Sequence, residues 1–207
     1  MALATLTQCK TAIGNLDTSS TSEDTFLQQL LDTVSAKIAR YLGYPPASAG
    51  ATPTIEDTTY THYSRTGELL VSEDGKTIYF PVRPVVSVTN VYDDVNLEWT
   101  TAETSTDYIL DGVAGRLIIK PAGTWGTATL GDTMAVKCVY VAGFETVPPD
   151  ITNACTLWVK HLFENRRTQG QTSMSEGGIS LGISQEAIPP NVRELLEPFK
   201  LNSLVML

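Results

Sequence analysis

Apolar residues recur at spacings of three and four over a long stretch near the start of the chain. This period predicts an amphipathic helix from Ser20 to Gly43. Ser20 and Glu23 have the spacing of a capping box, and Gly43 suits the left-handed residue that follows a helix. A weaker pattern over residues 3–16 predicts a short helix that ends near Gly14. The apolar positions of the long helix are Phe26, Leu27, Leu30, Leu31, Val34, Ile38, Tyr41 and Leu42.

A second strong helical pattern runs from Val147 to Arg167. The Pro148-Pro149 step fits a first helical turn, where proline loses no hydrogen bond. Asp150 at the start and two arginines at the end match the helix macrodipole. Its apolar stripe predicts packing against the first long helix, so that the two ends of the chain form one helical core. The candidate core and interface residues of this helix are Trp158, Leu162, Phe163, Arg166 and Arg167.

Residues 168–187 are rich in Gly, Ser and Gln and have no clear period. A structureless connection of this length is uncommon, so we expect a flexible loop that becomes ordered against another chain. Its candidate docking residues are Gly170, Met174, Gly177, Gly178 and Leu181. The Ile188-Pro189-Pro190 run then restarts a helix, which Pro198 should end. The apolar tail that follows is a further candidate interface, with Leu201, Leu204 and Leu207 as its main positions.

Between the helical segments the hydrophobic period falls from near 3.6 to 2, which predicts β-strands. Asp74-Gly75 favours a hairpin between two of them. The expected strands are Thr59–Tyr63, Leu69–Val71, Thr77–Val82, Val85–Tyr92, Leu97–Thr100, Tyr108–Leu110, Gly115–Lys120 and Met134–Val141. Short antiparallel strands of this kind make a small sandwich or half-open barrel.

The predicted fold class is therefore α+β. Residues 1–46 and 143–207 should form a helical core, and residues 55–142 an inserted antiparallel β domain. A chain of 207 residues suits one domain with such an insertion. Three cysteines without a CxxC pair indicate reduced thiols and make the cytoplasm the default compartment.

The formal net charge of -9 is concentrated in the middle of the chain. Residues 55–145 carry 13 acidic and 6 basic side chains, whereas the segments on either side are close to neutral. So acidic a chain is poorly suited to gripping nucleic acid, whose phosphates require Lys and Arg. It can still surround DNA without holding it. A well-solvated β surface explains the same charge equally well.

No pattern in the sequence specifies an enzyme, a metal site or a cofactor. The chain has no GxSxG nucleophile motif to accompany its two histidines, His62 and His161, and the scattered cysteines offer no chelating pair. The adjacent acids Asp93-Asp94 suit a turn better than a cation site. Three aromatic residues, Tyr92, Trp99 and Trp125, raise the possibility of a sugar-stacking surface, although packing within the fold is the commoner use of such residues.

Several short motifs, taken together in their order along the chain, resemble the gp6-like head–tail connector family of tailed bacteriophages, also termed adaptor or head-completion proteins. The most specific is Val147-Pro148-Pro149-Asp150-Ile151 followed by Phe163-Glu164-Asn165-Arg166. The others are TLTQCKTAIG near the start, Ala39 to Pro45, Phe80 to Val88, Tyr108-Ile109-Leu110, Gly115-Arg116-Leu117 and Tyr140 to Phe144. The simplest members of that family are nearly all helical, so a large β insertion departs from them.

The resemblance implies a structural protein of the virion, assembled in the host cytoplasm and placed at the head–tail interface. It implies a ring of identical subunits, a dodecamer matching the portal, which docks on the portal protein and extends the DNA channel. DNA would pass through without sequence-specific binding, and tail, stopper or tail-completion proteins would attach below. It implies no catalysis, no cofactor and no membrane. Two alternatives remain: a β-sandwich binding module of a phage tail or carbohydrate-binding protein that forms no ring, and a hydrolase whose site has no recognisable motif.

Overall fold

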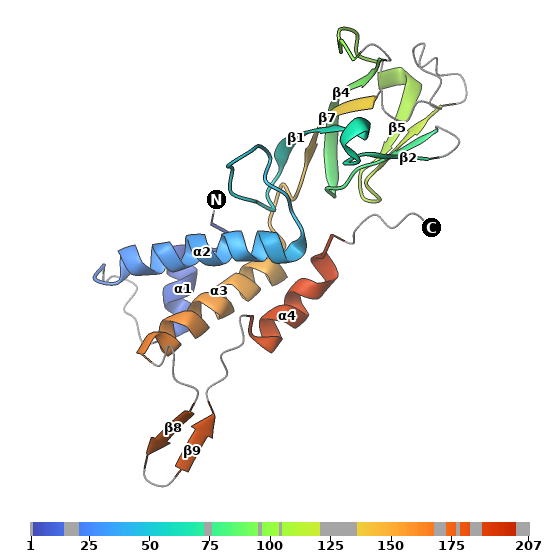
Figure 1. The fold of residues 1–207 in the computed structure, drawn as a ribbon. Coiled ribbons are helices and arrows are strands. Elements are labelled where there is room, and N and C mark those ends of the chain that lie inside the picture. Colours follow the sequence, from blue (N-terminus) through green and yellow to red (C-terminus); the bar gives the residue numbers. More distant parts are fainter. Residues whose placement is uncertain are drawn as a thin grey trace. The chain divides into compact units, whose positions relative to one another are not determined.

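The structure is a computed structural model that describes residues 2–14, 21–72, 76–94, 97–103, 105–120, 136–167, 173–176, 179–182 and 188–201. The chain forms two compact units (Figure 1). Residues 1–42 and 147–200 form the first, called here the helical unit. Residues 43–146 and 201–207 form the second, called the β unit.

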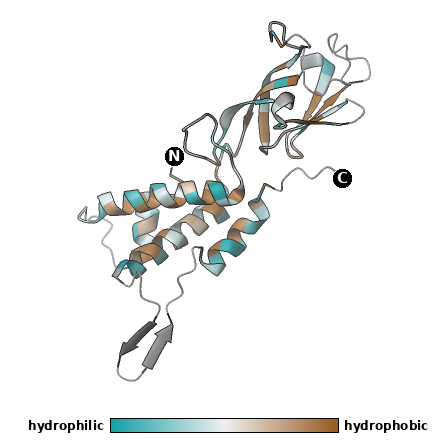
Figure 2. Cartoon of the chain, viewed as in Figure 1, coloured by the Kyte–Doolittle hydropathy of each residue, from teal (hydrophilic) through white to brown (hydrophobic). Residues whose placement is uncertain are grey.

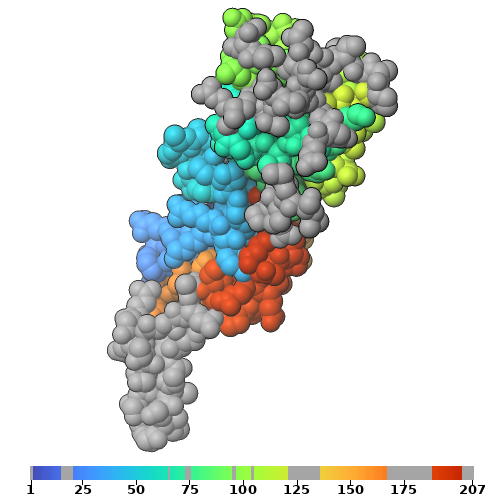
Figure 3. Space-filling model, turned by 45° about the vertical axis from the view of Figure 1, so that its right-hand side comes forward, coloured from blue at the N-terminus to red at the C-terminus, as the bar shows by residue number. Residues whose placement is uncertain are grey.

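Among the described residues, the helical unit has four α-helices: α1 (Leu6–Ile13), α2 (Asp24–Leu42), α3 (Pro149–Glu164) and α4 (Pro190–Leu196). A 3-10 turn continues α3 over Asn165–Arg167 (η3), and another continues α4 over Glu197–Phe199 (η4). Figure 3 shows the blue N-terminal segment beside the orange and red C-terminal segments in this unit. The predicted α+β fold with a helical core from both chain ends is confirmed.

Local sequence signals explain where these helices begin and end. At α1 the Thr5 hydroxyl accepts a hydrogen bond from the Gln8 backbone N–H, and the Gln8 side chain accepts one from the Thr5 backbone N–H. Gly43 follows α2 with a φ of 88°, the left-handed value expected from the sequence. Pro149 is the first residue of α3, as predicted. The Ser20 capping position lies outside the described residues, and α2 itself begins at Asp24.

The apolar stripes of α2 and α3 face each other in the core of the helical unit. α3 packs against α1, α2 and α4, so it is the central helix. Hydrophobic residues gather where these helices meet (Figure 2). Among the buried side chains are Cys9, Ile13, Leu27, Leu31, Val34, Ile38, Leu42, Ile151, Ala154, Cys155, Trp158, Val159, Val192 and Leu196.

In the described part of the β unit, seven strands form two antiparallel sheets. The first sheet has the order β1 (Thr58–Tyr63), β7 (Val136–Ala142), β4 (Val85–Asp93). The second has the order β2 (Leu70–Val71), β3 (Thr77–Tyr79), β6 (Arg116–Ile119), β5 (Tyr108–Asp111). Short 3-10 turns lie at Ser64–Thr66 (η1) and Ser105–Asp107 (η2). Seven of the eight expected strands are present, and β2 pairs with β3 as predicted.

Large aromatic side chains fill the interior of the β unit. Tyr60 of β1 lies opposite Tyr140 of β7 in the register, and both are buried. The Phe80 ring centroid lies 4.4 Å from that of Tyr140. Close backbone packing also shapes this unit: Gly143 has a φ of 121°, and a Cβ there would come within 2.5 Å of the Glu56 carbonyl oxygen. Only glycine meets both conditions without strain.

The prediction of a strand over Leu97–Thr100 is wrong. Leu97 and Trp99 have φ values of 62° and 54°, which are incompatible with an extended strand. The Asp94 carboxylate instead accepts hydrogen bonds from the Glu98 and Trp99 backbone N–H groups, at 2.9 and 2.8 Å. An aspartate that bonds nearby backbone in this way builds a turn in place of a sheet ladder.

Residues 173–182 contain two strands that the sequence analysis missed. β8 (Ser173–Glu176) pairs antiparallel with β9 (Ile179–Gly182). The absence of a clear period over 168–187 therefore did not mean an absence of regular structure. A signal was present nevertheless, because two glycines between two short runs are typical of a tight hairpin.

Candidate assembly surfaces

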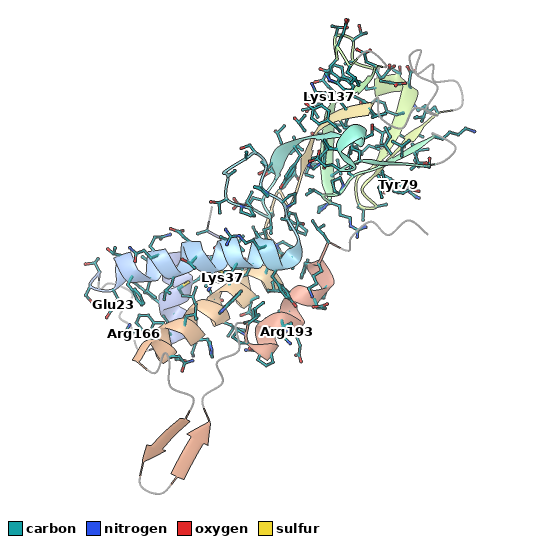
Figure 4. All side chains as sticks on the ribbon, viewed as in Figure 1. Glu23, Lys37, Tyr79, Lys137, Arg166 and Arg193 are labelled. Atoms are coloured by element: carbon teal, nitrogen blue, oxygen red, sulfur yellow. The ribbon has the colours of Figure 1, made fainter. Side chains whose placement is uncertain are left out.

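A group of charged and aromatic side chains lies at the end of α3, beside the start of α2. The Arg166 guanidinium lies 3.9 Å from the centroid of the Phe163 ring, and its Nη2 lies 3.5 Å from Glu23 Oε1. The Phe26 ring centroid is 6.1 Å from that of Phe163, and Phe26 is 37% exposed. Figure 4 shows Glu23 and Arg166 at the same end of the helical unit. We call Glu23, Phe26, Phe163 and Arg166 the Glu23–Arg166 cluster.

The local sequence dictates this arrangement. Phe163 and Arg166 are three residues apart at the end of α3, so they share one face of the helix and its 3-10 extension. Phe26 lies in the first turn of α2, directly after Glu23 and Asp24. Exposed aromatic and arginine side chains dominate the binding energy of many protein interfaces. The Glu23–Arg166 cluster is therefore a candidate assembly surface.

A second group lies at the other end of α2, where α4 and η4 meet it. The Tyr41 hydroxyl donates a hydrogen bond of 3.0 Å to Glu197 Oε2, and Lys200 Nζ lies 2.9 Å from the same oxygen. Lys200 Nζ is also 4.3 Å from the centroid of the Tyr41 ring. Hydrogen bonds from Lys200 and Tyr41 hold the pKa of Glu197 below its usual value. These three residues form the Tyr41–Lys200 cluster, which sequence reasoning missed because 156 positions separate Tyr41 from Glu197.

The structure divides the predicted interface residues of α3 between core and surface. Trp158 is 2% and Phe163 7% exposed, so both belong mainly to the core. Leu162 is half-buried and Arg166 is partly exposed. Arg167 lies in η3, and its side chain is not among those described.

The remaining predicted positions lie in the hairpin and the tail. Met174 of β8 is opposite Leu181 of β9 in the register. Leu201 is half-buried. Outside the described residues lie Gly170, Gly177, Gly178, Leu204 and Leu207.

A buried ion pair fixes α1 against the start of α2. Lys10 is only 5% exposed, and its Nζ lies 2.5 Å from Asp24 Oδ1. A buried lysine with a carboxylate partner specifies one arrangement of two helices, since any other arrangement leaves a charge without a counter-ion. The sequence analysis did not single out either residue, because the stripe of α1 is read from its apolar positions alone.

Two of the aromatic residues considered for sugar stacking, Tyr92 and Trp99, lie around a lysine together with Tyr63. Lys137 Nζ lies 4.9 Å from the Tyr92 ring centroid, 5.9 Å from that of Trp99 and 6.0 Å from that of Tyr63. The three rings are therefore engaged by a cation of the same chain. Trp125 lies outside the described residues. This geometry offers no support for the carbohydrate-binding alternative.

Among the buried ionisable groups of the β unit whose pKa is shifted are His62 and Asp93. Burial lowers the pKa of His62, whose Nδ1 lies 2.8 Å from the Tyr140 hydroxyl. Burial raises the pKa of Asp93 to about 6, and the charges of Glu103 and Asp94 add to this. Both oxygens of Asp93 are buried without a hydrogen-bond partner among the described residues. The ionised Asp93 carboxylate thus lowers the stability of the folded β unit near neutral pH.

Cys9, Cys138 and Cys155 are all buried, and burial raises the pKa of each thiol. The reactive thiolate form is therefore disfavoured at all three. Among the described side chains, no three His, Cys, Asp or Glu residues group as a metal site. Within the described parts of the chain, no helix is both long and apolar enough to cross a membrane.

Comparison with known proteins identifies a family and a solved structure of similar fold. Residues 2–201 match the model of a protein family described as head completion protein. A chain in the structure of the virion of a native gene transfer agent particle has a similar fold, with a TM-score of 0.55 and 18% sequence identity. That alignment covers 98% of this chain and 92% of the other. At 18% identity it shows a shared fold. No curated protein matches the sequence.

Proposed function

Because the chain belongs to the head completion protein family, we propose that it is a structural head–tail connector of a phage-like virion. In this role identical copies form a ring that docks on the portal protein, extends the DNA channel and provides the attachment site for the tail. The protein has no catalytic activity in this proposal and needs no cofactor. The family match over residues 2–201 is the observation that carries the proposal.

The helical unit offers what a ring of identical copies requires. A head-to-tail ring uses a heterologous interface, which needs two different patches on each subunit. The Glu23–Arg166 cluster lies at the start of α2, and the Tyr41–Lys200 cluster lies at its end. The 15 residues from Phe26 to Tyr41 correspond to roughly 22 Å of helix, so the patches are well separated. We infer that they meet neighbouring copies or the portal.

The acidic β unit suits the wall of a DNA channel. Residues 55–145 carry 13 acidic and 6 basic side chains. DNA binds proteins mainly through its phosphates, which cationic side chains attract and carboxylates repel. A wall of net negative charge therefore lets DNA pass without holding it. The proposed ring is a dodecamer that follows the portal, and tail or stopper proteins bind its far side.

Two experiments test this function. Particles produced without this protein should have heads that fail to join tails, whereas normal tailed particles in its absence would exclude a connector role. Purified protein should bind immobilised portal protein and, once bound, form closed rings in negative-stain images.

Matched variants test the surfaces. Arg166→Ala should reduce ring formation at least tenfold with an unchanged circular dichroism spectrum, because it removes a partly exposed arginine of the kind that dominates interface binding energy. Arg116→Ala, which removes an exposed arginine of β6 in the β unit and lies in neither cluster, is the control and should assemble normally. Equal assembly by both variants would exclude the Glu23–Arg166 cluster from the interface.

A further inference from the structure

The β8–β9 hairpin is too small to be stable in isolation. Its ladder consists of four residue pairs: Ser173 with Gly182, Met174 with Leu181, Ser175 with Ser180, and Glu176 with Ile179. Within the part of the chain that the structure describes, neither strand pairs with a third one. A two-stranded sheet is at best marginally stable in water, and a third strand or a packed face is needed for more.

The register gives the two faces of this hairpin different residues. Directly opposite residues of an antiparallel pair share a face, and successive residues of a strand alternate between faces. One face therefore has Met174, Leu181, Glu176 and Ile179, and the other has only serine and glycine positions.

Both outer edges of the hairpin lack the features that normally prevent strand pairing. Edge strands of soluble proteins carry lysine, proline or bulges that block the approach of another strand. β8 and β9 contain neither lysine nor proline, and their register shows no bulge. Glu176 is the only charged residue in the two strands. Over the described residues, neither strand therefore carries a feature that would block another strand at its outer edge.

We propose that β8 of one copy pairs edge to edge with β9 of the next copy, which links the hairpins of neighbouring subunits into one continuous sheet. The proposal rests on the ring assembly of the proposed function. Each copy has two different edges, and joining unlike edges around a rotation axis is a heterologous contact that can close into a ring. The pairing gives every hairpin a further strand at each outer edge, which a two-stranded sheet needs for stability.

Single-cysteine variants can detect this contact. One preparation carries Ser175→Cys on β8, and a second carries Ser180→Cys on β9. These positions are opposite each other within one hairpin, so a double variant would link to itself, whereas separate preparations can link only between copies. The native cysteines are all buried and do not compete for the reagent. A short bifunctional thiol reagent is applied to rings formed on portal protein from an equal mixture.

The mixture should yield covalent dimers at least five times more abundantly than either variant alone. Ser105→Cys, at an exposed position of η2, serves as the control for chance collisions when it replaces one partner. Rings that form without cross-linking above this control would overturn the edge pairing and leave the ring function intact. Equal dimers from Ser175→Cys alone would also overturn it, because like edges would then be paired. Failure to form rings at all would overturn both proposals.

Discussion

Truncation of Trp158 is the most direct test of the helical core. Its side chain is 2% exposed and lies on α3, which contacts the other three helices. The indole Nε1 has no hydrogen-bond partner among the described residues, so truncation removes apolar contacts and leaves a cavity. Replacing a buried tryptophan by alanine costs about 3–5 kcal/mol. Lys37 Nζ, 5.9 Å from the ring centroid, adds about 0.5–1 kcal/mol of cation–π attraction.

The total loss from Trp158→Ala should be about 4 kcal/mol. For a unit of about 100 residues, that lowers the melting temperature by roughly 15 °C or more. Thermal unfolding followed by circular dichroism at 222 nm, where the helices dominate, measures the change. Trp158→Phe fills most of the same volume and should lose less than half as much. A Trp158→Ala protein that melts within 3 °C of the parent would refute the packing of α3 at the centre of the unit.

Three further substitutions test other features. Lys10→Met should lower the free energy of unfolding by about 2 kcal/mol in urea titrations, because it leaves the Asp24 carboxylate without its counter-ion; no loss would exclude a structural role for the pair. Asp93→Asn should stabilise the β unit at pH 7 by up to about 3 kcal/mol, because a folded pKa of about 6 lies above the unfolded value. The stability of the parent relative to this variant should be highest below pH 4 and fall as the pH rises through 6, and a difference independent of pH would contradict the assignment. Gly143→Ala should destabilise the β unit by more than 2 kcal/mol, because its Cβ meets the Glu56 carbonyl oxygen and its φ is positive. Gly50→Ala, with a positive φ but open space around it, is the matched control and should cost only about 1 kcal/mol.

The helices were predictable because their signals are local. The stripes of α2 and α3, the Pro149 start and the Gly43 end depend on residues within a few positions of one another. Their pairing followed from the requirement that two long apolar faces be buried. The Tyr41–Lys200 cluster did not follow, because it depends on where α4 lies against α2, and no local pattern encodes that placement.

The β unit shows how side chains can override a strand-like pattern. Leu97 and Trp99 alternate with polar neighbours as a strand would, but Asp94 binds the backbone that a partner strand would need. The burial of Asp93 was equally hidden, because adjacent acids in a sequence usually indicate a solvated turn. The β8–β9 hairpin was missed for the opposite reason: its strands are short, and serine and glycine obscure the alternation on which strand prediction depends.

The way in which the β unit is inserted has an evolutionary consequence. α2 ends and α3 begins on the same side of the helical unit (Figure 1), so the residues that join them start and finish near one place in a core that both helices complete. An inserted β unit attached in this manner can be lengthened, shortened or replaced while the hydrophobic contacts of α2 with α3 are retained. Lineages that share this helical scaffold are therefore free to differ in the inserted β unit far more than in the helices that carry it.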